Sequence, residues 1–400
     1  MKTASLIVAL LLACGAVHAR ELPSCAKPEE SRLIIPRDSS RLQYFAACMK
    51  ALRNSPDNSA TIWHIGGSHV QAGWFSSRLR HNFDSIGHYP SAGRGYIFPY
   101  PLAHTNFDRS YLVGYQGEWL GTRSSNPNKS VPVQPGYGIM GIAAYTADTL
   151  ASFGLRTPTP FQSLHIMAES SDSSVYPVVV SGSDTLRCVR DVLLKGYYVE
   201  FPSPVDTVQV FPGLRDGQHF VITGLLPQMP GSTGLTFLST GVNGARTTTW
   251  LERCPQWRSE MSLVHPDLVI LGLGINDSTM PAGDFRPDRF KANYRRLLDA
   301  IREESPFCAF IFISNNDSWR YARRGMVHND NGEAVRVAMM ELAREYSGAM
   351  WDLYGIMGGE GSATQWRDAG LMKDDRLHFT REGYELLGDM LYRAIEELCD

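Results

Sequence analysis

The last third of the sequence alternates between short apolar runs and longer amphipathic segments. The apolar runs are short enough to be buried strands, and the segments between them place apolar side chains at the 3.6-residue spacing of one helix face. Strands and helices that alternate in this way are typical of a parallel α/β sheet. Strands are predicted at 267–273 (DLVILGL), 307–314 (FCAFIFIS) and 349–354, and helices at 288–304, 331–346 and from about 380 to 398.

The same strand-and-helix unit occurs once near the N-terminus. Residues 61–65 (TIWHI) are predicted to form a strand and residues 70–83 a helix. The pattern resumes with a strand at 235–239 (LTFLS) and a helix at 247–261. The sequence therefore predicts one α/β sheet whose first unit is separated from the rest by more than a hundred residues.

The intervening stretch, from about 107 to 234, has a different character. Helical periods are scarce there, Gly, Pro and Ser are frequent, and short β-rich runs recur. Such a stretch reads as an inserted β-sandwich, because inserted domains are tolerated where their two ends lie close together on the surface of the host. The β-rich runs are 164–168, 178–181, 197–201, 205–211 and 219–223.

Composition limits the class of protein. The chain has 400 residues, of which 43% are hydrophobic and 20% charged, and a formal net charge of −3. These values are typical of a packed globular protein, and the absence of a basic run argues against nucleic acid as a partner. After the N-terminal segment no apolar run reaches the roughly 18 residues that a membrane-spanning helix needs.

Residues 1–19 have the layout of a secretory signal. Lys2 precedes an apolar run from Ala4 to Ala13, and small residues lead to Ala19. We expect the protein to be exported to the periplasm or envelope. An alternative is cleavage before Cys14, which would make this cysteine a lipidated first residue and the protein a tethered lipoprotein.

Removing Cys14 with the signal leaves an even number of cysteines, which permits disulfides in an exported chain. Their pairing cannot be deduced from spacing, and Cys308 lies in a predicted buried strand where a free thiol is expected. No Cys-x-x-Cys occurs, so a structural zinc site has no support. The six are Cys25, Cys48, Cys188, Cys254, Cys308 and Cys399.

Chemistry-bearing residues follow several of the predicted strands. Ser68 comes just after the first strand, behind Gly66-Gly67, which suits a sharp turn into a helix. The N–H groups at the start of that helix can stabilise a developing oxyanion. Asp375 and His378 are three residues apart before the last helix, so one turn can bring the carboxylate to the imidazole. A serine, a histidine and an aspartate in these positions indicate an acyl-transfer triad.

Two further residues can complete an oxyanion site. Asn276 follows the strand at 267–273 and can donate a side-chain N–H, and Gly244 lies in a glycine turn after the strand at 235–239 and can donate its backbone N–H. With the Ser68 N–H, these would make a three-donor oxyanion hole.

The four segments that contain Ser68, Gly244, Asn276 and His378 together resemble the SGNH (GDSL-type) hydrolase family. The resemblance covers roughly residues 45–100 and 235–400. Ser68, Gly244, Asn276 and His378 occur in family order. The resemblance implies a flavodoxin-like parallel sheet and serine esterase chemistry that uses no metal or cofactor. One position departs from the pattern, since the first block reads Gly-Gly-Ser, with Gly67 where the family usually has aspartate.

The insertion is similar to that of peptidoglycan O-acetylesterases of this family, which carry a carbohydrate-binding β-sandwich at this point. The resemblance therefore implies an acylated carbohydrate or cell-wall glycan as substrate. The predicted organisation is a signal peptide at 1–19, a hydrolase domain in two parts at 45–105 and 235–400, and an inserted β-rich domain at 106–234.

Neighbouring residues have other interpretations. His64 and His69 flank the serine turn, but no carboxylate-rich cluster at ligand spacing accompanies them, so a metal site is disfavoured. Gly272-Leu273-Gly274 lacks the third glycine of a dinucleotide turn. The protein as a whole could instead be a non-catalytic glycan-binding envelope protein on a hydrolase scaffold, or an O-acyltransferase.

Aromatic side chains at the start of the insertion have two interpretations. Tyr115, Trp119 and Tyr137 could stack on sugar rings or pack into the core of the β-rich domain, and we expect packing.

Overall fold

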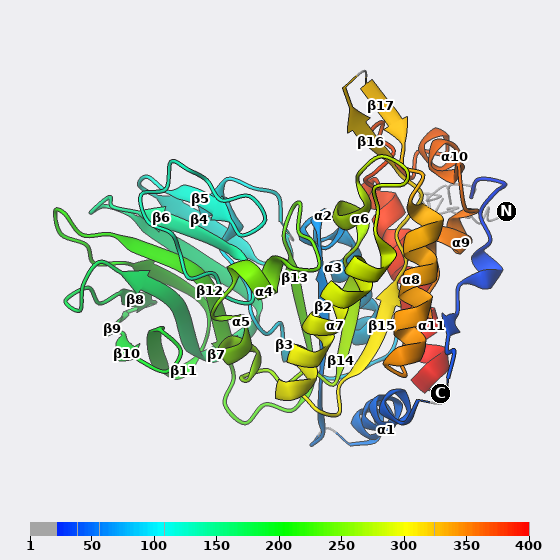
Figure 1. Ribbon diagram of the computed structural model, residues 1–400. Coiled ribbons are helices and arrows are strands. Elements are labelled where there is room, and N and C mark those ends of the chain that lie inside the picture. The colour runs from blue at the N-terminus through cyan, green and yellow to red at the C-terminus, as the bar shows by residue number, and fades with distance from the viewer. Residues whose placement is uncertain (1–21, 38, 56, 108, 324, 400) are drawn as a thin grey trace, which may run out of the picture.

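The computed structural model describes residues 22–37, 39–55, 57–107, 109–323 and 325–399 of the chain. It has an α/β part and a β-rich part that lie side by side (Figure 1). The predicted signal segment 1–19, with Cys14, lies outside the described residues. None of the helices in the described ranges is long and apolar enough to cross a membrane.

Among the described residues, seven strands form the sheet of the α/β part, in the order β1-β18-β15-β14-β2-β13-β3. All neighbours in this sheet are parallel except β1, which runs antiparallel to β18. The predicted parallel α/β fold with a β-rich insertion is confirmed. The strands are β1 (Leu33–Ile34), β2 (Ser59–Gly66), β3 (Ser91–Gly93), β13 (Gly234–Gly241), β14 (Leu268–Gly272), β15 (Ala309–Ile313) and β18 (Ala349–Trp351).

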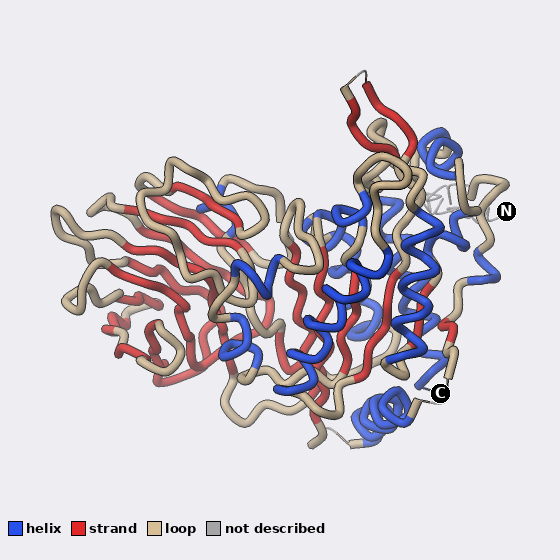
Figure 2. Tube along the Cα trace, viewed as in Figure 1, coloured by secondary structure: helices blue, strands red, loops and turns tan. Residues whose placement is uncertain are grey.

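Helices cover both faces of this sheet (Figure 2). Alternation along β15 shows how: Phe310 and Phe312 pack into one apolar cluster, and Ile311 into the other. The Phe310 side carries α7 (Pro287–Glu304) and α8 (Gly332–Glu345), and the Ile311 side carries α1 (Ser40–Asn54), α3 (Trp74–Ser85) and α11 (Arg381–Cys399). Both faces of β15 are thus buried, as its continuous apolar run predicts.

Two predicted helices are each broken into two. The segment 247–261 forms α4 (Thr249–Arg253) and α5 (Trp257–Met261), because Pro255 lacks an N–H and keeps the preceding residue out of the helical region. The segment 70–83 begins earlier, as α2 (Ser68–Gln71), and α3 starts only after Gly73 at φ +83°. The prediction of continuous helices was wrong at both places.

The strand predicted at 349–354 ends at Trp351. Asp352 caps a short helix, α9 (Leu353–Met357), by accepting a hydrogen bond from the Gly355 N–H at 3.2 Å. Further elements of the α/β part were not anticipated from the sequence. They include β1, α1, β3, α6 (Ile275–Ser278), β16 (Trp319–Ala322), β17 (Gly325–His328) and α10 (Ser362–Asp368).

The β-rich part is an antiparallel sheet of nine strands within the described residues. Its strands are β4 (Leu112–Gln116), β5 (Leu120–Arg123), β6 (Ile142–Thr146), β7 (Ser152–Ser170), β8 (Val178–Ser181), β9 (Asp184–Arg187), β10 (Val189–Asp191), β11 (Gly196–Phe211) and β12 (Phe220–Gln228). The runs predicted separately at 197–201 and 205–211 are one strand, β11.

The two long strands, β7 and β11, divide this sheet into halves. The first half of β7 pairs with β4 and its second half with β12, while β11 pairs first with β10 and then with β8. The register between β7 and β11 slips between Glu200 and Val205, beside Pro202 and Pro204. Prolines cannot donate to the ladder, so both long strands change neighbours where it is interrupted.

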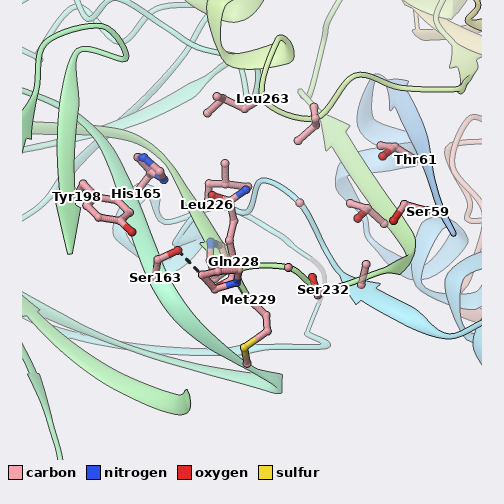
Figure 3. Close-up of a pocket in the computed structure, with 17 residues that line it drawn as sticks. Ser59, Thr61, Ser163, His165, Tyr198, Leu226, Gln228, Met229, Ser232 and Leu263 are labelled. Carbon is pink, nitrogen blue, oxygen red and sulfur yellow. Dashed lines mark hydrogen bonds between the residues drawn. The ribbon is translucent and has the colours of Figure 1, made fainter. Parts of the chain in front are cut away.

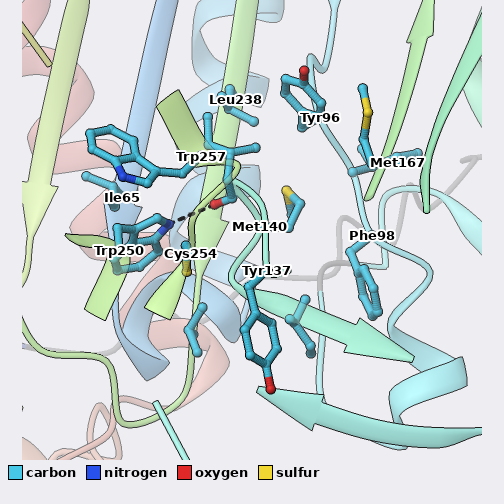
Figure 4. Close-up of a cluster of buried hydrophobic side chains, with 14 of the residues drawn as sticks. Ile65, Tyr96, Phe98, Tyr137, Met140, Met167, Leu238, Trp250, Cys254 and Trp257 are labelled. Carbon is cyan, nitrogen blue, oxygen red and sulfur yellow. Dashed lines mark hydrogen bonds between the residues drawn. The ribbon is translucent and has the colours of Figure 1, made fainter. Parts of the chain in front are cut away.

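The β-rich part and one face of the α/β sheet share a single apolar core (Figure 4). Trp250 of α4 and Trp257 of α5 pack in the same cluster as Met140 and Met167 of the β-rich part. The Trp250 indole N–H donates to the Ile139 carbonyl at 2.8 Å. The two parts are therefore joined by buried packing as well as by their chain connections.

Within the ranges that the structure describes, the cysteines form no disulfides. Cys25, Cys48, Cys188, Cys254 and Cys308 are free thiols, and the last three are buried. Burial raises the pKa of Cys188 and of Cys254 to about 12, so both remain protonated and unreactive at neutral pH.

Glu260 of α5 is a buried carboxyl between the two parts. Its side chain is 1% exposed, and its Oε2 accepts the Ile139 N–H at 2.7 Å. Burial raises the pKa of Glu260 from 4.5 to about 8, with the Ile139 hydrogen bond acting against it. At neutral pH this carboxyl is therefore mostly protonated in the folded protein and ionised in the unfolded chain.

Folding thus takes up a proton at Glu260, and the associated stability is complete below pH 4.5 and is lost as the pH rises through about 8. We expect Glu260→Gln to remove this dependence. Between about pH 5.5 and 8.5 the free energy of unfolding of the variant should gain about 3 kcal/mol relative to wild type. Denaturant unfolding at both pH values measures this, with the exposed Glu252→Gln as control. An unchanged difference between variant and wild type at the two pH values would contradict it.

Candidate active site

Ser68 lies directly after β2, at the carboxyl end of the sheet. Gly66 allows the turn, because a Cβ there would come within 2.4 Å of a Val70 methyl and 2.9 Å of the Gly272 carbonyl. Ser68 is the first residue of α2, so its backbone N–H has no acceptor within the helix. Open α/β sheets bind ligands at the carboxyl ends of their strands, which is where this serine is placed.

The structure brings Ser68, His378 and Asp375 together in a line of hydrogen bonds. Ser68 Oγ lies 2.8 Å from His378 Nε2, and His378 Nδ1 lies 2.7 Å from Asp375 Oδ2. The other oxygen, Asp375 Oδ1, accepts the backbone N–H groups of Leu377 and His378 at 3.0 and 2.9 Å. The sequence spacing of Asp375 and His378 is thus realised as one compact turn.

The carboxylate of Asp375 is held in its ionised form. Partial burial acts to raise its pKa, but the hydrogen bonds from the His378 ring and from the two backbone N–H groups outweigh burial, and the pKa lies well below its usual value. An ionised Asp375 accepts a proton-bearing Nδ1, which leaves Nε2 of His378 free to accept the Ser68 proton.

Residues after β15 support the histidine turn, and sequence reasoning did not identify them. Asn316 donates its side-chain N–H to the Leu377 carbonyl at 3.1 Å, and Trp319 donates its backbone N–H to the Arg376 carbonyl at 3.0 Å. The Arg376 guanidinium lies 4.2 Å from the centre of the Trp319 ring. The polar run Asn315-Asn316-Asp317-Ser318, directly after a buried strand, was the signal available in the sequence.

His69 is a neutral neighbour of the line. Its Nδ1 lies 2.8 Å from the Tyr384 hydroxyl, and its ring centre is 5.5 Å from that of His378. Burial, with a smaller contribution from the neighbouring His378, lowers the pKa of His69 to about 3. His64, the other histidine near the serine turn, is buried and bonds Ser76 at 2.9 Å. In the described ranges, no group of three or more potential ligand side chains could hold a metal ion.

Gly244 and Asn276 lie beside the serine turn. The Asn276 amide donates one N–H to the Ala245 carbonyl at 3.0 Å, and a Cβ on Gly67 would lie 3.2 Å from the same amide nitrogen. An amide group carries two N–H donors, so the second remains available. Gly244 is exposed, with φ +81°. Its N–H has no acceptor among the described residues.

Asp277 ties the two donor loops to each other. Its carboxylate accepts the Thr247 hydroxyl at 2.7 Å and the Thr247 N–H at 3.2 Å. Burial raises the pKa of Asp277 to about 6, against the hydrogen bonds from Thr247. At pH 7 the carboxylate is therefore still mainly ionised and able to accept both bonds.

The position of Gly67 explains why this departure from the family pattern is compatible with the site. A side chain here would start 3.2 Å from the Asn276 amide nitrogen, which in this chain bonds the Ala245 carbonyl instead. With glycine at 67 the amide is thus oriented by the 242–245 turn and not by a neighbouring carboxylate.

A cleft away from Ser68 is lined by residues of both the α/β part and the β-rich part (Figure 3). Its volume is about 450 Å³, and it is lined by Ser59 and Thr61 at the start of β2 together with His165, Tyr198 and Gln228 of the β-rich part. Ser68 lies beyond the other end of β2, roughly 20 Å away at about 3.3 Å per residue. This cleft is therefore not part of the site around Ser68.

The aromatic residues near the start of the β-rich part mostly pack inward, as expected. Trp119 and Tyr137 are 3% and 2% exposed, and only Tyr115, at 40%, reaches solvent. The Trp119 ring meets Phe153 edge to face at 6.2 Å.

Comparisons with known proteins agree with this architecture. Residues 212–386 match the model of the GDSL-like lipase/acylhydrolase family. This span includes Gly244, Asn276, Asp375 and His378 but begins after Ser68. No curated protein sequence matches the chain.

Among solved structures, a peptidoglycan O-acetylesterase aligns with a TM-score of 0.69 at 19% identity, over 89% of this chain and 95% of the other. An acetyl xylan esterase aligns more loosely, with a TM-score of 0.33 at 15% identity, over 40% of this chain and 81% of the other. A family two carbohydrate esterase from Cellvibrio japonicus has a TM-score of 0.31 at 10% identity, over 72% and 99%. Residues 212–386 are thus similar to GDSL-like lipases and acylhydrolases, and the chain as a whole has the fold of a peptidoglycan O-acetylesterase.

Proposed function

We propose that this protein is an exported serine esterase that removes acetyl or other short acyl groups from a carbohydrate, with peptidoglycan O-acetyl groups as the leading substrate. The observation that carries the proposal is the line from Ser68 Oγ to His378 Nε2 and from His378 Nδ1 to Asp375, with distances of 2.8 and 2.7 Å. Hydrogen-bond contact between nucleophile, base and orienting carboxylate is the requirement for activating a serine.

In the first half of the reaction, Ser68 Oγ attacks the acyl carbon while His378 Nε2 takes the hydroxyl proton. The carbonyl oxygen becomes an oxyanion, and it would be held by the N–H groups of Ser68 and Gly244 and by the side-chain amide of Asn276. The bond to the sugar oxygen then breaks, the sugar leaves with the proton from His378, and the acyl group stays on Ser68.

In the second half, His378 takes a proton from a water molecule, which attacks the acyl carbon. The same donors hold the second oxyanion. The bond to Ser68 Oγ then breaks, His378 returns the proton to it, and the carboxylic acid leaves. Asp375 stabilises the charged imidazole in both halves and is not itself protonated.

The carbohydrate part of the proposal is supported by the β-rich domain, proposed to span 106–234 between hydrolase parts at 45–105 and 235–400. The similarity to a peptidoglycan O-acetylesterase includes this domain, since it extends over 89% of the chain. Export is supported by the layout of residues 1–19, with Cys14 as the alternative point of lipid attachment.

Acetate release tests the proposal. Purified protein should release acetate from a chromogenic acetyl ester, and faster from O-acetylated peptidoglycan than from O-acetylated xylan. Preference for neither glycan would remove the carbohydrate assignment while leaving the esterase intact.

The same assay separates the alternatives. Acetylated sugar product in place of free acetate would identify an acyltransferase. Glycan binding without any ester turnover would identify a non-catalytic binding protein.

A further inference from the structure

A tight turn carries Gly244. The Ala245 N–H donates to the Val242 carbonyl at 2.9 Å, which closes a four-residue turn with Gly244 in its third position at φ +81°. A positive φ in the third position is the mark of a type II turn, whereas type I turns have φ near −90° there. The two types differ by a rotation of the central peptide, here the one joining Asn243 and Gly244.

The orientation of that peptide decides where the Gly244 N–H points. In a trans peptide the carbonyl of one residue and the N–H of the next lie on opposite sides. Rotating the central peptide would therefore turn the Gly244 N–H away from the side on which it now lies. Gly244 is exposed and its N–H has no acceptor among the described residues. The hydrogen bond that closes the turn therefore does not fix the direction of this N–H.

Ser125 supplies the bond that holds this peptide. Its Oγ donates to the Asn243 carbonyl at 2.6 Å. It also lies over the glycine, since a Cβ on Gly244 would be 3.6 Å from the same oxygen. With the Asn243 carbonyl held toward Ser125, the Gly244 N–H is directed to the opposite side of the turn.

Ser125 belongs to the β-rich part, and its own backbone is fixed there. It lies in a turn after β5, closed by the Asn126 N–H donating to the Arg123 carbonyl at 3.2 Å. The preceding Ser124 is buried and donates both its N–H and its hydroxyl to the Gly141 carbonyl, at 2.9 and 2.8 Å. Hydrogen bonds of the two neighbouring residues therefore fix the backbone on both sides of Ser125.

The other clamp on this turn acts on a different peptide. Gln71, which is 3% exposed, accepts the Asn243 N–H at 2.6 Å. That N–H belongs to the peptide joining Val242 and Asn243, so the bond leaves the Asn243–Gly244 peptide free to rotate. Ser125 is therefore the side chain that selects between the two orientations.

We infer that Ser125 is a positioning residue that aims the Gly244 N–H into the oxyanion hole, so that the inserted β-rich domain supplies part of the catalytic geometry. The inference rests on the proposed esterase function. A donor aimed at the oxyanion acts in the transition state and not on the bound ester, so its loss lowers kcat and leaves KM nearly unchanged.

The test compares Ser125→Ala with Ser125→Thr on a chromogenic acetyl ester. Loss of one oxyanion donor commonly costs about 10²- to 10³-fold, and a donor that is correctly aimed in only about 1 to 10% of molecules should cost about 10- to 100-fold in kcat. Ser125→Thr keeps the hydroxyl and should retain most of the activity. Ser130→Ala is the matched control in the same domain, because Ser130 joins its loop through its backbone N–H.

A boronic acid inhibitor gives a second readout that a structural role alone would not move. Its boron bonds Ser68 Oγ, the hydroxyl proton passes to His378, and the resulting anion places an oxygen where the oxyanion forms. Its inhibition constant should weaken in Ser125→Ala by a factor similar to the loss in kcat. If Ser125→Ala does not fold, Ser125→Cys keeps the volume with a weaker donor and should show the same direction of change.

Wild-type kcat in Ser125→Ala, in an enzyme that Ser68→Ala inactivates, would overturn the inference and leave the esterase assignment standing. A lower kcat would also overturn it if the melting temperature falls as well, KM rises and the affinity for the inhibitor is unchanged. If the wild-type protein itself shows no turnover, the failure lies with the proposed function.

Discussion

Ser68→Ala should lower kcat for acetyl-ester hydrolysis by about 10⁴- to 10⁶-fold, because no other group can form the acyl-enzyme once this hydroxyl is gone. KM should change little, since the ester is held by groups other than the serine hydroxyl. The measurement is steady-state hydrolysis of a chromogenic acetyl ester by wild type and variant at equal concentration.

The control for this experiment is Ser85→Ala. Ser85 is exposed on α3, the helix that follows the Ser68 turn, and its hydroxyl bonds only a surface histidine, His81, at 3.3 Å. This variant should keep wild-type activity, and both variants should keep the wild-type melting temperature. Full activity in Ser68→Ala would contradict the proposed mechanism.

Asp375→Asn should lower kcat by about 10³- to 10⁴-fold, because it changes which ring nitrogen of neutral His378 carries the proton. Asparagine can still accept the backbone N–H groups of Leu377 and His378 with its oxygen, as Oδ1 does now. Its NH₂ then replaces Oδ2 and donates to His378 Nδ1, which forces the proton of the neutral ring onto Nε2. A protonated Nε2 cannot accept the Ser68 proton.

Asp374 provides a matched control next to Asp375. It is exposed and equal in charge, so Asp374→Asn should leave kcat within about twofold of wild type. Because Asp375 is ionised well below neutral pH, its effect should persist across the whole range in which the enzyme is active. A larger loss in Asp374→Asn than in Asp375→Asn would show that the carboxylate was assigned to the wrong residue.

Local pattern was sufficient wherever one helix or strand buries a continuous face. The prediction of a helix at 288–304 agrees with α7 to within one residue, because its apolar side chains repeat at helical spacing and Pro287 can begin the helix. The prediction at 247–261 failed for the converse reason. The apolar periodicity suggested a helix that continues through Pro255. Because Pro255 has no backbone N–H, α4 ends near Cys254.

Contacts between distant segments could not be read from the sequence. Ser125 lies 118 positions from Asn243, and Asn316 lies 61 positions from Leu377. Neither Ser125 nor Asn316 stands in a motif, and each reaches the site by a hydrogen bond to the backbone carbonyl of a distant residue. Serine and asparagine are common in loops, so their residue type alone carries no signal.

The sequence by itself determined the α/β pattern, the β-rich character of the insertion and the residue types of the candidate site, because apolar periodicity and short motifs are local properties of the chain. Tertiary structure alone decided that Ser68 meets the Asp375–His378 turn within hydrogen-bond distance. It also decided that a serine of the β-rich part holds the Gly244 peptide, since peptide orientation depends on a partner brought near only by folding.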